Sequence, residues 1–290
     1  MIKISHVDIN LFKKYTLEIP GVNSLDYGYS SICKYNNFYY LLLNLYNRGC
    51  IISKSSNFAD FSEFKVLFSY SNPIFDKEGN MEATQSLFIN NNKLYIICSS
   101  ASGYGTYGDG HYICEIDTEQ LCLKSNIIGN YFKKIVEDKK LDTQPSIIYF
   151  KEKYILYTRL NIRTKERCTK IYTSKNLPFY NKNYTTIKFP YFIYTQNIIP
   201  FDNKLYGIFY YYIQPSNDYN TYKVCITEST DGIDFTNIIK LDLFPNLSVV
   251  PGTGYINIDE TTLYAPFTIN RNKLKGEIYL FNKINLINKK

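Results

Sequence analysis

The sequence has no tryptophan, and only two histidines and two methionines occur among its 290 residues. With His6 and His111 as its only histidines, the chain is a poor source of histidine ligands for a metal. No Cys-x-x-Cys pair occurs, and the spacing of Cys114 and Cys122 is not that of a zinc site. We therefore expect neither a metal nor another cofactor.

The seven cysteines are an odd number, and several lie in apolar, strand-like patterns, as Cys98 and Cys225 do. Buried thiols explain them better than disulfides. No stretch reaches the roughly 18 apolar residues of a membrane span. The first eight residues lack the apolar core of a signal peptide. We expect no membrane span and a cytoplasmic location.

Arginine is also scarce, with five residues, so most of the basic charge is lysine. The net charge of +7 is spread along the chain, whereas nucleic-acid-binding proteins usually concentrate it. We expect no nucleic-acid partner. A hydrophobic content of 45% with 20% charged residues excludes intrinsic disorder. The aromatic content of 17% consists of tyrosine and phenylalanine, which favour strands.

A repeated segment is the most informative feature of the sequence. Each copy reads as a strand, a polar turn and a second strand, and ends at a landmark tyrosine. Three copies carry Thr-Gln at one fixed distance before that tyrosine, and Thr253 keeps the position in the fifth. The landmark tyrosines are separated by 55, 59, 52 and 58 residues and are Tyr40, Tyr95, Tyr154, Tyr206 and Tyr264.

A third strand follows each copy, and a fourth returns after it, as at residues 64–68. Four antiparallel strands repeated five times predict an all-β, five-bladed β-propeller in one domain covering 1–290. The alternative is a β-sandwich with chance similarity. We expect the segment 1–28 to close the ring onto the last blade. The expected blades span roughly residues 29–75, 82–130, 141–190, 193–245 and 250–290.

Ligands of a propeller bind where the first strands of the blades converge. An acidic residue precedes three consecutive first strands, namely Asp26, Glu82 and Asp142, which lie 14, 13 and 12 residues before their landmark tyrosines. Repulsion between carboxylates around one funnel would raise the pKa of at least one of them. A neutral carboxyl beside a charged one is what hydrolysis of a glycosidic bond needs.

With these acids and the Ser229-Thr230-Asp231-Gly232 turn, the chain resembles the superfamily of five-bladed glycoside hydrolases, which includes families 43, 32, 68 and 130. The stretch 142–146, followed by Arg159 and Arg167, is similar to a third-blade pattern of that superfamily. The resemblance implies that Asp26 is the base, Glu82 the residue that tunes the pKa, and Asp142 the acid. We expect the Asp231 turn to stabilise a blade.

The sequence departs from the family at two points. The usual Asp-Pro of the first two blades is replaced by Tyr29-Ser30 and Thr84-Gln85. The acids are also offset by a residue or two, which turns a side chain to the other face of a strand unless a bulge corrects it.

Further candidates for substrate binding are polar or aromatic. Arg159 and Arg167 suit a carboxylate or a pair of sugar hydroxyls, although Arg159 and Asp142 could instead form a structural ion pair. The loop 102–112 suggests a lid in which Tyr107 stacks on a sugar and His111 is an accessory acid or base. The repeated glutamines are either sugar ligands or structural polar groups lining the channel, and they are Gln85, Gln144 and Gln196.

These features predict a glycosidase-like enzyme with a carbohydrate or sugar-conjugate ligand. One alternative is a non-catalytic sugar-binding propeller in polysaccharide or glycan assembly. Another is a glycosyl transferase or phosphorylase on the same scaffold. The sugar, the stereochemical outcome and the oligomeric state stay open.

Overall fold

A computed structural model gives the architecture of the chain. The described residues are 27–45, 49–58, 61, 63–69, 86–100, 110–124, 133–136, 143–163, 166–179, 183–214, 222–241, 249–257, 262–269 and 279–285. The segment 1–26, which makes up almost all of the part expected to close the ring, lies outside them.

The strands of the described residues form five sheets. Sheet 1 contains β1 (Tyr27–Tyr35), β2 (Phe38–Leu45), β3 (Gly49–Ser55) and β4 (Phe64–Ser69), and β19 (Thr253–Gly254) joins its inner edge. Sheet 2 contains β5 (Ser86–Asn90), β6 (Lys93–Ser100), β7 (Gly110–Asp117), β8 (Cys122–Leu123) and β9 (Lys133–Val136). Sheet 3 contains β10 (Thr143–Phe150), β11 (Lys153–Arg163), β12 (Glu166–Ser174) and β13 (Thr185–Thr186).

Sheet 4 contains β14 (Phe192–Phe201), β15 (Lys204–Tyr212), β16 (Lys223–Ser229) and β17 (Thr236–Leu241). Sheet 5 contains β18 (Val249–Pro251), β20 (Ile256–Asn257), β21 (Thr262–Ile269) and β22 (Tyr279–Asn285).

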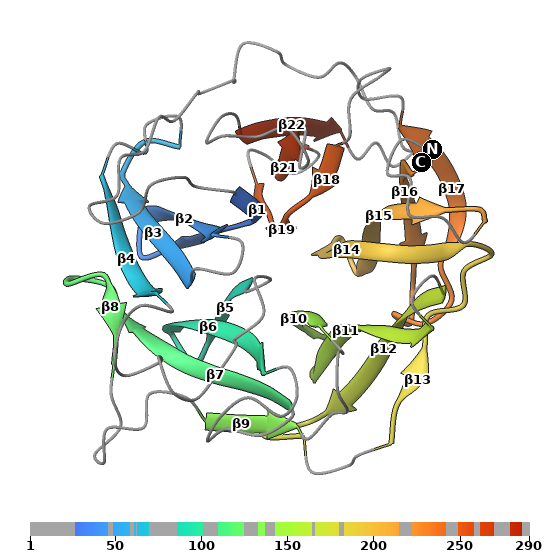
Figure 1. The fold of residues 1–290 in the computed structure, drawn as a ribbon, viewed down its shortest axis with the longest axis horizontal. Coiled ribbons are helices and arrows are strands. Elements are labelled where there is room, and N and C mark those ends of the chain that lie inside the picture. Colours follow the sequence, from blue (N-terminus) through green and yellow to red (C-terminus); the bar gives the residue numbers. More distant parts are fainter. Residues whose placement is uncertain are drawn as a thin grey trace.

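The sheets stand around a common centre, with β1, β5, β10, β14 and β19 innermost (Figure 1). This arrangement is an all-β propeller, as the repeat predicted. The prediction of five blades with four antiparallel strands each is met only in part. Sheets 1, 3 and 4 keep their consecutive strands in chain order, and in sheet 2 both β8 and β9 pair with β7. Sheet 5 is irregular, because β21 lies between β18 and β20, while β19 pairs in parallel with β1.

Two-residue turns join the first two strands of sheets 1 to 4. Both residues of each turn have positive φ, between 46° and 65°. Such turns match the twist of the flanking strands, and asparagine and aspartate tolerate this backbone region well. The turns lie where the sequence predicted them, at Asn36-Asn37, Asn91-Asn92, Lys151-Glu152 and Asp202-Asn203. In the fifth copy of the repeat, the polar turn before Tyr264 is expected at Asp259-Glu260, which lies outside the described residues.

The hydrophobic core is divided into five clusters, and each cluster fills the space between two successive sheets. Between sheets 1 and 2, for example, Leu42 and Ile52 share a cluster with Ile96 and Cys98. The cluster that unites Ile32 of sheet 1 with Ile256 brings the two ends of the described chain together. Each first strand therefore borders two clusters and the centre, which fixes its position.

The Ser229–Gly232 turn has the local role that its sequence predicted. The Asp231 carboxylate accepts hydrogen bonds from the backbone N–H groups of Ile233 (2.8 Å) and Asp234 (3.0 Å). Partial burial raises the pKa of Asp231, but these hydrogen bonds outweigh it and leave the pKa below its usual value. Tyr157 of sheet 3 donates to the carbonyl of Gly232 at 3.2 Å, so the turn also ties sheet 4 to sheet 3.

All seven cysteines lie in the described part of the chain as thiols, so the prediction of no disulfides is confirmed. Burial raises the pKa of the Cys114 thiol to about 12, which makes it unreactive at neutral pH. No helix suited to crossing a membrane occurs among the described residues.

Contact between sheets 5 and 1 depends on Gly254. Its φ is +80°, and a Cβ placed there would lie 1.9 Å from the carbonyl oxygen of Ile32. Asn197 of sheet 4 holds the same residue, because its amide accepts from the Gly254 N–H at 3.0 Å and donates to the Gly254 carbonyl at 2.9 Å. Only glycine fits this close approach of two backbones.

Replacement of Gly254 by alanine should lower the free energy of unfolding by about 2–3 kcal/mol, because both the left-handed φ and the overlap with Ile32 oppose a side chain. Denaturant unfolding of the purified variant measures the change. Asn257→Ala, an exposed position three residues away, is the control and should stay within about 0.5 kcal/mol of the parent. An equal loss in both variants would contradict the role assigned to Gly254.

Buried tyrosines should limit alkaline stability. Burial raises the pKa of Tyr40, Tyr211 and Tyr212 from 10 to about 12. A raised folded-state pKa contributes stability that is complete below pH 10 and is lost as the pH rises toward 12. Tyrosinate absorbance should show one class of tyrosines ionising near pH 10 and a second near pH 12, together with unfolding. A single class at pH 10 in the folded chain would overturn this assignment.

Candidate functional site

The first strands of three sheets carry a β-bulge at the end where they begin. The pairing register shifts between Tyr27 and Ser30 in β1, between Thr143 and Ser146 in β10, and between Ile193 and Thr195 in β14. A bulge places one extra residue in a strand and turns the preceding side chains to the other face. A bulge was the condition that the sequence set for the offset acids. Two of the three strands that follow a predicted acid, β1 and β10, carry one, and the acids themselves lie outside the described residues.

Gln144 lies in the bulge of β10, with a φ of 57°, and is buried. In the amide orientation that gives every atom a complementary partner, its oxygen accepts from Arg159 Nη1 at 2.7 Å and from the Tyr29 hydroxyl at 3.0 Å. Its nitrogen then donates to the Tyr194 carbonyl at 2.7 Å and to Thr195 Oγ1 at 3.3 Å. One side chain thus joins sheets 1, 3 and 4.

Gln196 makes a second connection between sheets 3 and 4. Its amide nitrogen donates to the Gln144 carbonyl at 3.2 Å, and its oxygen accepts from Thr169 Oγ1 at 3.1 Å. Gln144 and Gln196 are therefore both bonded to protein groups, as the structural alternative for the repeated glutamines expects. A role in binding sugar stays a prediction for both.

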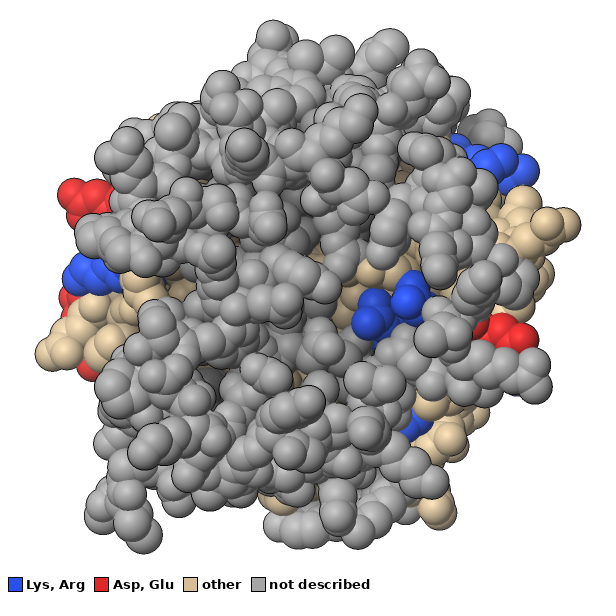
Figure 2. Space-filling view, viewed as in Figure 1, with Lys and Arg blue, Asp and Glu red and all other residues tan. Residues whose placement is uncertain are grey.

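Two arginines of sheet 3 lie against one aromatic ring of sheet 4. The guanidinium carbon of Arg159 is 5.0 Å from the centre of the Tyr194 ring, and that of Arg167 is 4.6 Å from it. Both arginines are half-buried. Blue basic side chains also lie near the centre of the face in Figure 2, beside a recessed area. The mouth of the channel therefore carries two half-buried arginines that cover a buried aromatic ring.

Further aromatic rings of sheet 4 pack on one another beside Tyr194. The Tyr212 ring stacks on Tyr222 at 4.7 Å and on Phe192 at 5.3 Å. Burial raises the pKa of Tyr212, while the charges of Arg167 and Arg159 lower it, with a net value of about 12. Tyr212 is therefore a neutral hydrogen-bond donor at any pH at which the protein would work.

His111 begins the third strand of sheet 2 and is completely buried. Its Nδ1 lies 3.0 Å from Ser99 Oγ on the neighbouring strand. This hydrogen bond holds the imidazole ring of His111 in one orientation. A role as an accessory acid or base stays a prediction.

The other sequence-predicted site residues lie outside the described residues. They are the three predicted catalytic carboxylates with one glutamine and one tyrosine, namely Asp26, Glu82, Asp142, Gln85 and Tyr107. The described part of the chain holds no group of three or more histidine, cysteine, aspartate and glutamate side chains that could bind a metal ion.

Sequence reasoning missed Tyr29, Tyr194, Tyr212 and Tyr222 at this mouth. In a chain with 30 tyrosines, no single one stands out. Tyr29 and Tyr194 could have been found from position alone, because Tyr29 adjoins the expected Asp-Pro position of blade 1 and Tyr194 precedes a Thr-Gln pair.

No protein-family model and no curated protein sequence matches the chain. Among solved structures, the fold is similar to that of a thermostable family-43 glycoside hydrolase, with a TM-score of 0.59 and 16% identity over 94% of each chain. It is also similar to an N-acetylgalactosamine deacetylase from F. plautii, with a TM-score of 0.64 and 11% identity over 98% of this chain and 94% of that one. A third similar structure is an arabinanase from Bacillus subtilis, with a TM-score of 0.58 and 14% identity over 91% of this chain and 95% of that one. At these identities the likeness confirms the propeller fold that the sequence suggested, and the fold alone.

Replacement of Gln144 by alanine should lower the free energy of unfolding by about 2–3 kcal/mol, because it leaves buried groups of Tyr29, Arg159 and Tyr194 without this partner. Thermal or denaturant unfolding measures the loss. Gln120→Ala, at an exposed turn, is the matched control and should change little. A Gln144 variant as stable as the control would show that the amide does not join the sheets.

Proposed function

We propose that the chain is a glycosidase-like enzyme that hydrolyses a glycosidic bond at the mouth of the central channel. One observation carries the proposal: β1, β5 and β10 begin at residues 27, 86 and 143, directly or closely after Asp26, Glu82 and Asp142. Consecutive Cα atoms are about 3.8 Å apart. Chain connectivity therefore keeps Asp26 and Asp142 next to the mouth and Glu82 within about 15 Å of the start of β5.

The three carboxylates would divide the chemistry as the resemblance implies. Asp142 in its neutral form would give its proton to the leaving oxygen as the bond from that oxygen to the anomeric carbon breaks. Asp26 would take a proton from the water whose oxygen attacks that carbon. Glu82 would raise the pKa of Asp142 through charge repulsion. A separation of about 6.5–9.5 Å between acid and base gives inversion, and about 5–5.5 Å gives retention with a carboxylate nucleophile.

The described residues supply the means to hold a sugar. Arg159 pairs across the strands with Thr143, the neighbour of Asp142, so its guanidinium is in a position to contact either that carboxylate or a substrate hydroxyl. Tyr194 and Tyr212 are buried, but the neighbouring ring of Tyr222 is half-buried and can contact the apolar face of a sugar. The two arginines beside Tyr194 would favour a substrate rich in hydroxyl or carboxylate oxygens.

We also propose that the ring is a single five-bladed domain, with sheet 5 as the irregular fifth blade. The five interface clusters and the pairing of β19 with β1 support this count.

A non-catalytic sugar-binding protein is the second candidate. The two arginines beside Tyr194 favour it, because they can hold sugar hydroxyls without a carboxylate taking part. The transferase and phosphorylase alternatives need an acceptor or phosphate in place of water and use the same three carboxylates.

Activity against nitrophenyl glycosides tests the proposal, starting with α-L-arabinofuranosides because an arabinanase and an arabinofuranosidase are among the similar structures. Asp142→Asn and Asp26→Asn should each lower kcat at least about a hundredfold with the melting temperature unchanged. Asp234→Asn, an exposed carboxylate paired with Lys188, is the control and should keep full activity. The parent's kcat/KM should be bell-shaped with pH.

Binding of sugars without turnover, with phosphate present and absent, would favour the sugar-binding alternative. Activity that persists in both carboxylate variants would contradict the assignment of Asp26 and Asp142.

A further inference from the structure

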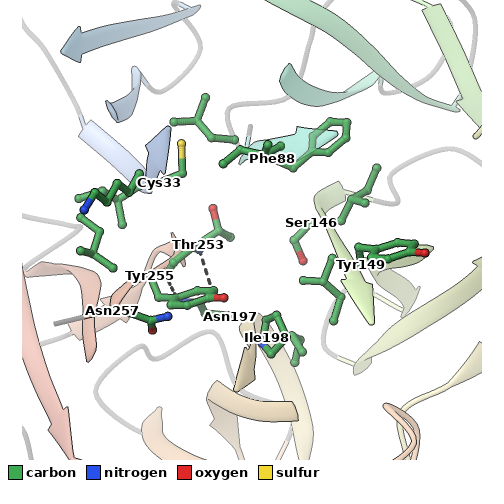
Figure 3. A pocket seen from close by; sticks show the side chains of 18 of the residues that line it. Cys33, Phe88, Ser146, Tyr149, Asn197, Ile198, Thr253, Tyr255 and Asn257 are labelled. Atoms are coloured by element: carbon green, nitrogen blue, oxygen red, sulfur yellow. Dashed lines mark hydrogen bonds between the residues drawn. The ribbon is translucent and has the colours of Figure 1, made fainter. Parts of the chain in front are cut away.

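A cavity of about 390 Å³ lies at the other end of the central channel. Its walls come from the later parts of the first strands, such as Ser146–Tyr149 of β10, whereas the mouth described above uses their beginnings. The sheets follow one another counterclockwise in Figure 1 and clockwise in Figure 3, so the cavity is seen from the opposite side. Ile89 and Tyr149, at its rim, are 42% and 56% exposed, so the cavity opens to solvent.

The cavity contains an unsatisfied polar group. Ser146 is 7% exposed, and its hydroxyl has no hydrogen-bond partner. Figure 3 shows this hydroxyl turned toward the middle of the cavity. The Thr253 hydroxyl, on another wall of the cavity, donates to Ser86 Oγ at 3.1 Å. A buried hydroxyl without a partner costs free energy that a bound ligand can recover.

The backbone adds further polar groups of both kinds. Among the described strands, β5, β10 and β14 each pair with one neighbour only, so their inner edges present N–H donors and C=O acceptors to the channel. Around these edges the lining is apolar, with Ile198 on one side and the ring of Tyr255 on another. The described lining includes one charged side chain, Lys34, which is exposed at the rim.

We propose that this cavity is a second binding site, for a neutral polyhydroxylated ligand of one or two sugar units. Hydroxyl groups both donate and accept, which matches the mixed backbone edges and the Ser146 hydroxyl. The apolar face of a sugar ring matches the isoleucines and Tyr255. An ionic ligand would find no opposite charge deep in the described lining, and a pure hydrocarbon would leave Ser146 unsatisfied. The site is separate from the mouth and does not depend on hydrolysis there.

Saturation-transfer NMR with methyl α-L-arabinofuranoside, methyl β-D-galactopyranoside and cellobiose tests the proposal, with indole and glucose 6-phosphate as apolar and charged comparison probes. At least one neutral sugar should bind saturably to the full chain. Ser146→Ala should weaken that binding about three- to tenfold, the value of one hydrogen bond. Its melting temperature should be unchanged or higher, because the variant removes an unsatisfied group. Ser146→Leu, which places a larger apolar side chain in the cavity and removes the hydroxyl, should weaken binding further.

Ser53→Ala is the matched control, since Ser53 is also buried with an unpartnered hydroxyl but does not line the cavity. It should leave sugar binding unchanged. Arg159→Gln, at the mouth, distinguishes binding there from binding in this cavity. Loss of binding in Arg159→Gln with retention in both Ser146 variants would overturn the proposal. Binding of indole or glucose 6-phosphate but of no neutral sugar would overturn it too, as would no saturable binding at all.

Discussion

Hydrogen bonds between the first strands hold the structure together at its centre. Side chains cross from each inner strand to the next: Ser31 Oγ accepts from Leu87 N–H, and Ser86 Oγ donates to the Pro145 carbonyl. Gln196 continues the circle from β14 to β10, Asn197 binds Gly254, and β19 pairs with β1. Each link is short and polar because two backbones approach closely at the channel. The hydrophobic clusters position the sheets behind these links, and the links add direct hydrogen bonds between the inner edges.

This constraint separates the channel into two chemically different ends. At the beginnings of the strands, bulges and the Gln144 amide bring two arginines and several tyrosines to one mouth. At the other end, the same strands run regularly, and their edges surround a cavity with few charges. The mouth is therefore the end proposed for a reaction on a polar substrate, and the cavity is the end proposed for a neutral ligand.

Much of the fold could be predicted from the sequence, because its determinants are local. Paired turn residues with positive φ, such as Asn36-Asn37, and the strands that flank them repeat at intervals of 52 to 59 residues between landmark tyrosines. The pairing of β19 with β1 could not be predicted, because it depends on a backbone approach at Gly254 that no periodicity reveals. The sequence indicated only that the offset acids would need a bulge to face the channel. It could not place the bulges, because an extra residue in a strand leaves no fixed sequence pattern. The sequence predicts the mouth at the starts of the first strands, but it gives no sign of the tyrosines there, because they are hidden among many others.

The central claim is that the mouth where the first strands begin binds a sugar between carboxylates from successive sheets. A crystal structure of the Asp142→Asn variant with an arabinose-containing oligosaccharide tests it most directly. The account predicts one sugar ring within hydrogen-bonding distance of Arg159, with Asp26 and residue 142 on opposite sides of a glycosidic bond, about 5–9.5 Å apart. An oligosaccharide bound away from this mouth, or carboxylates directed between the sheets, would contradict it.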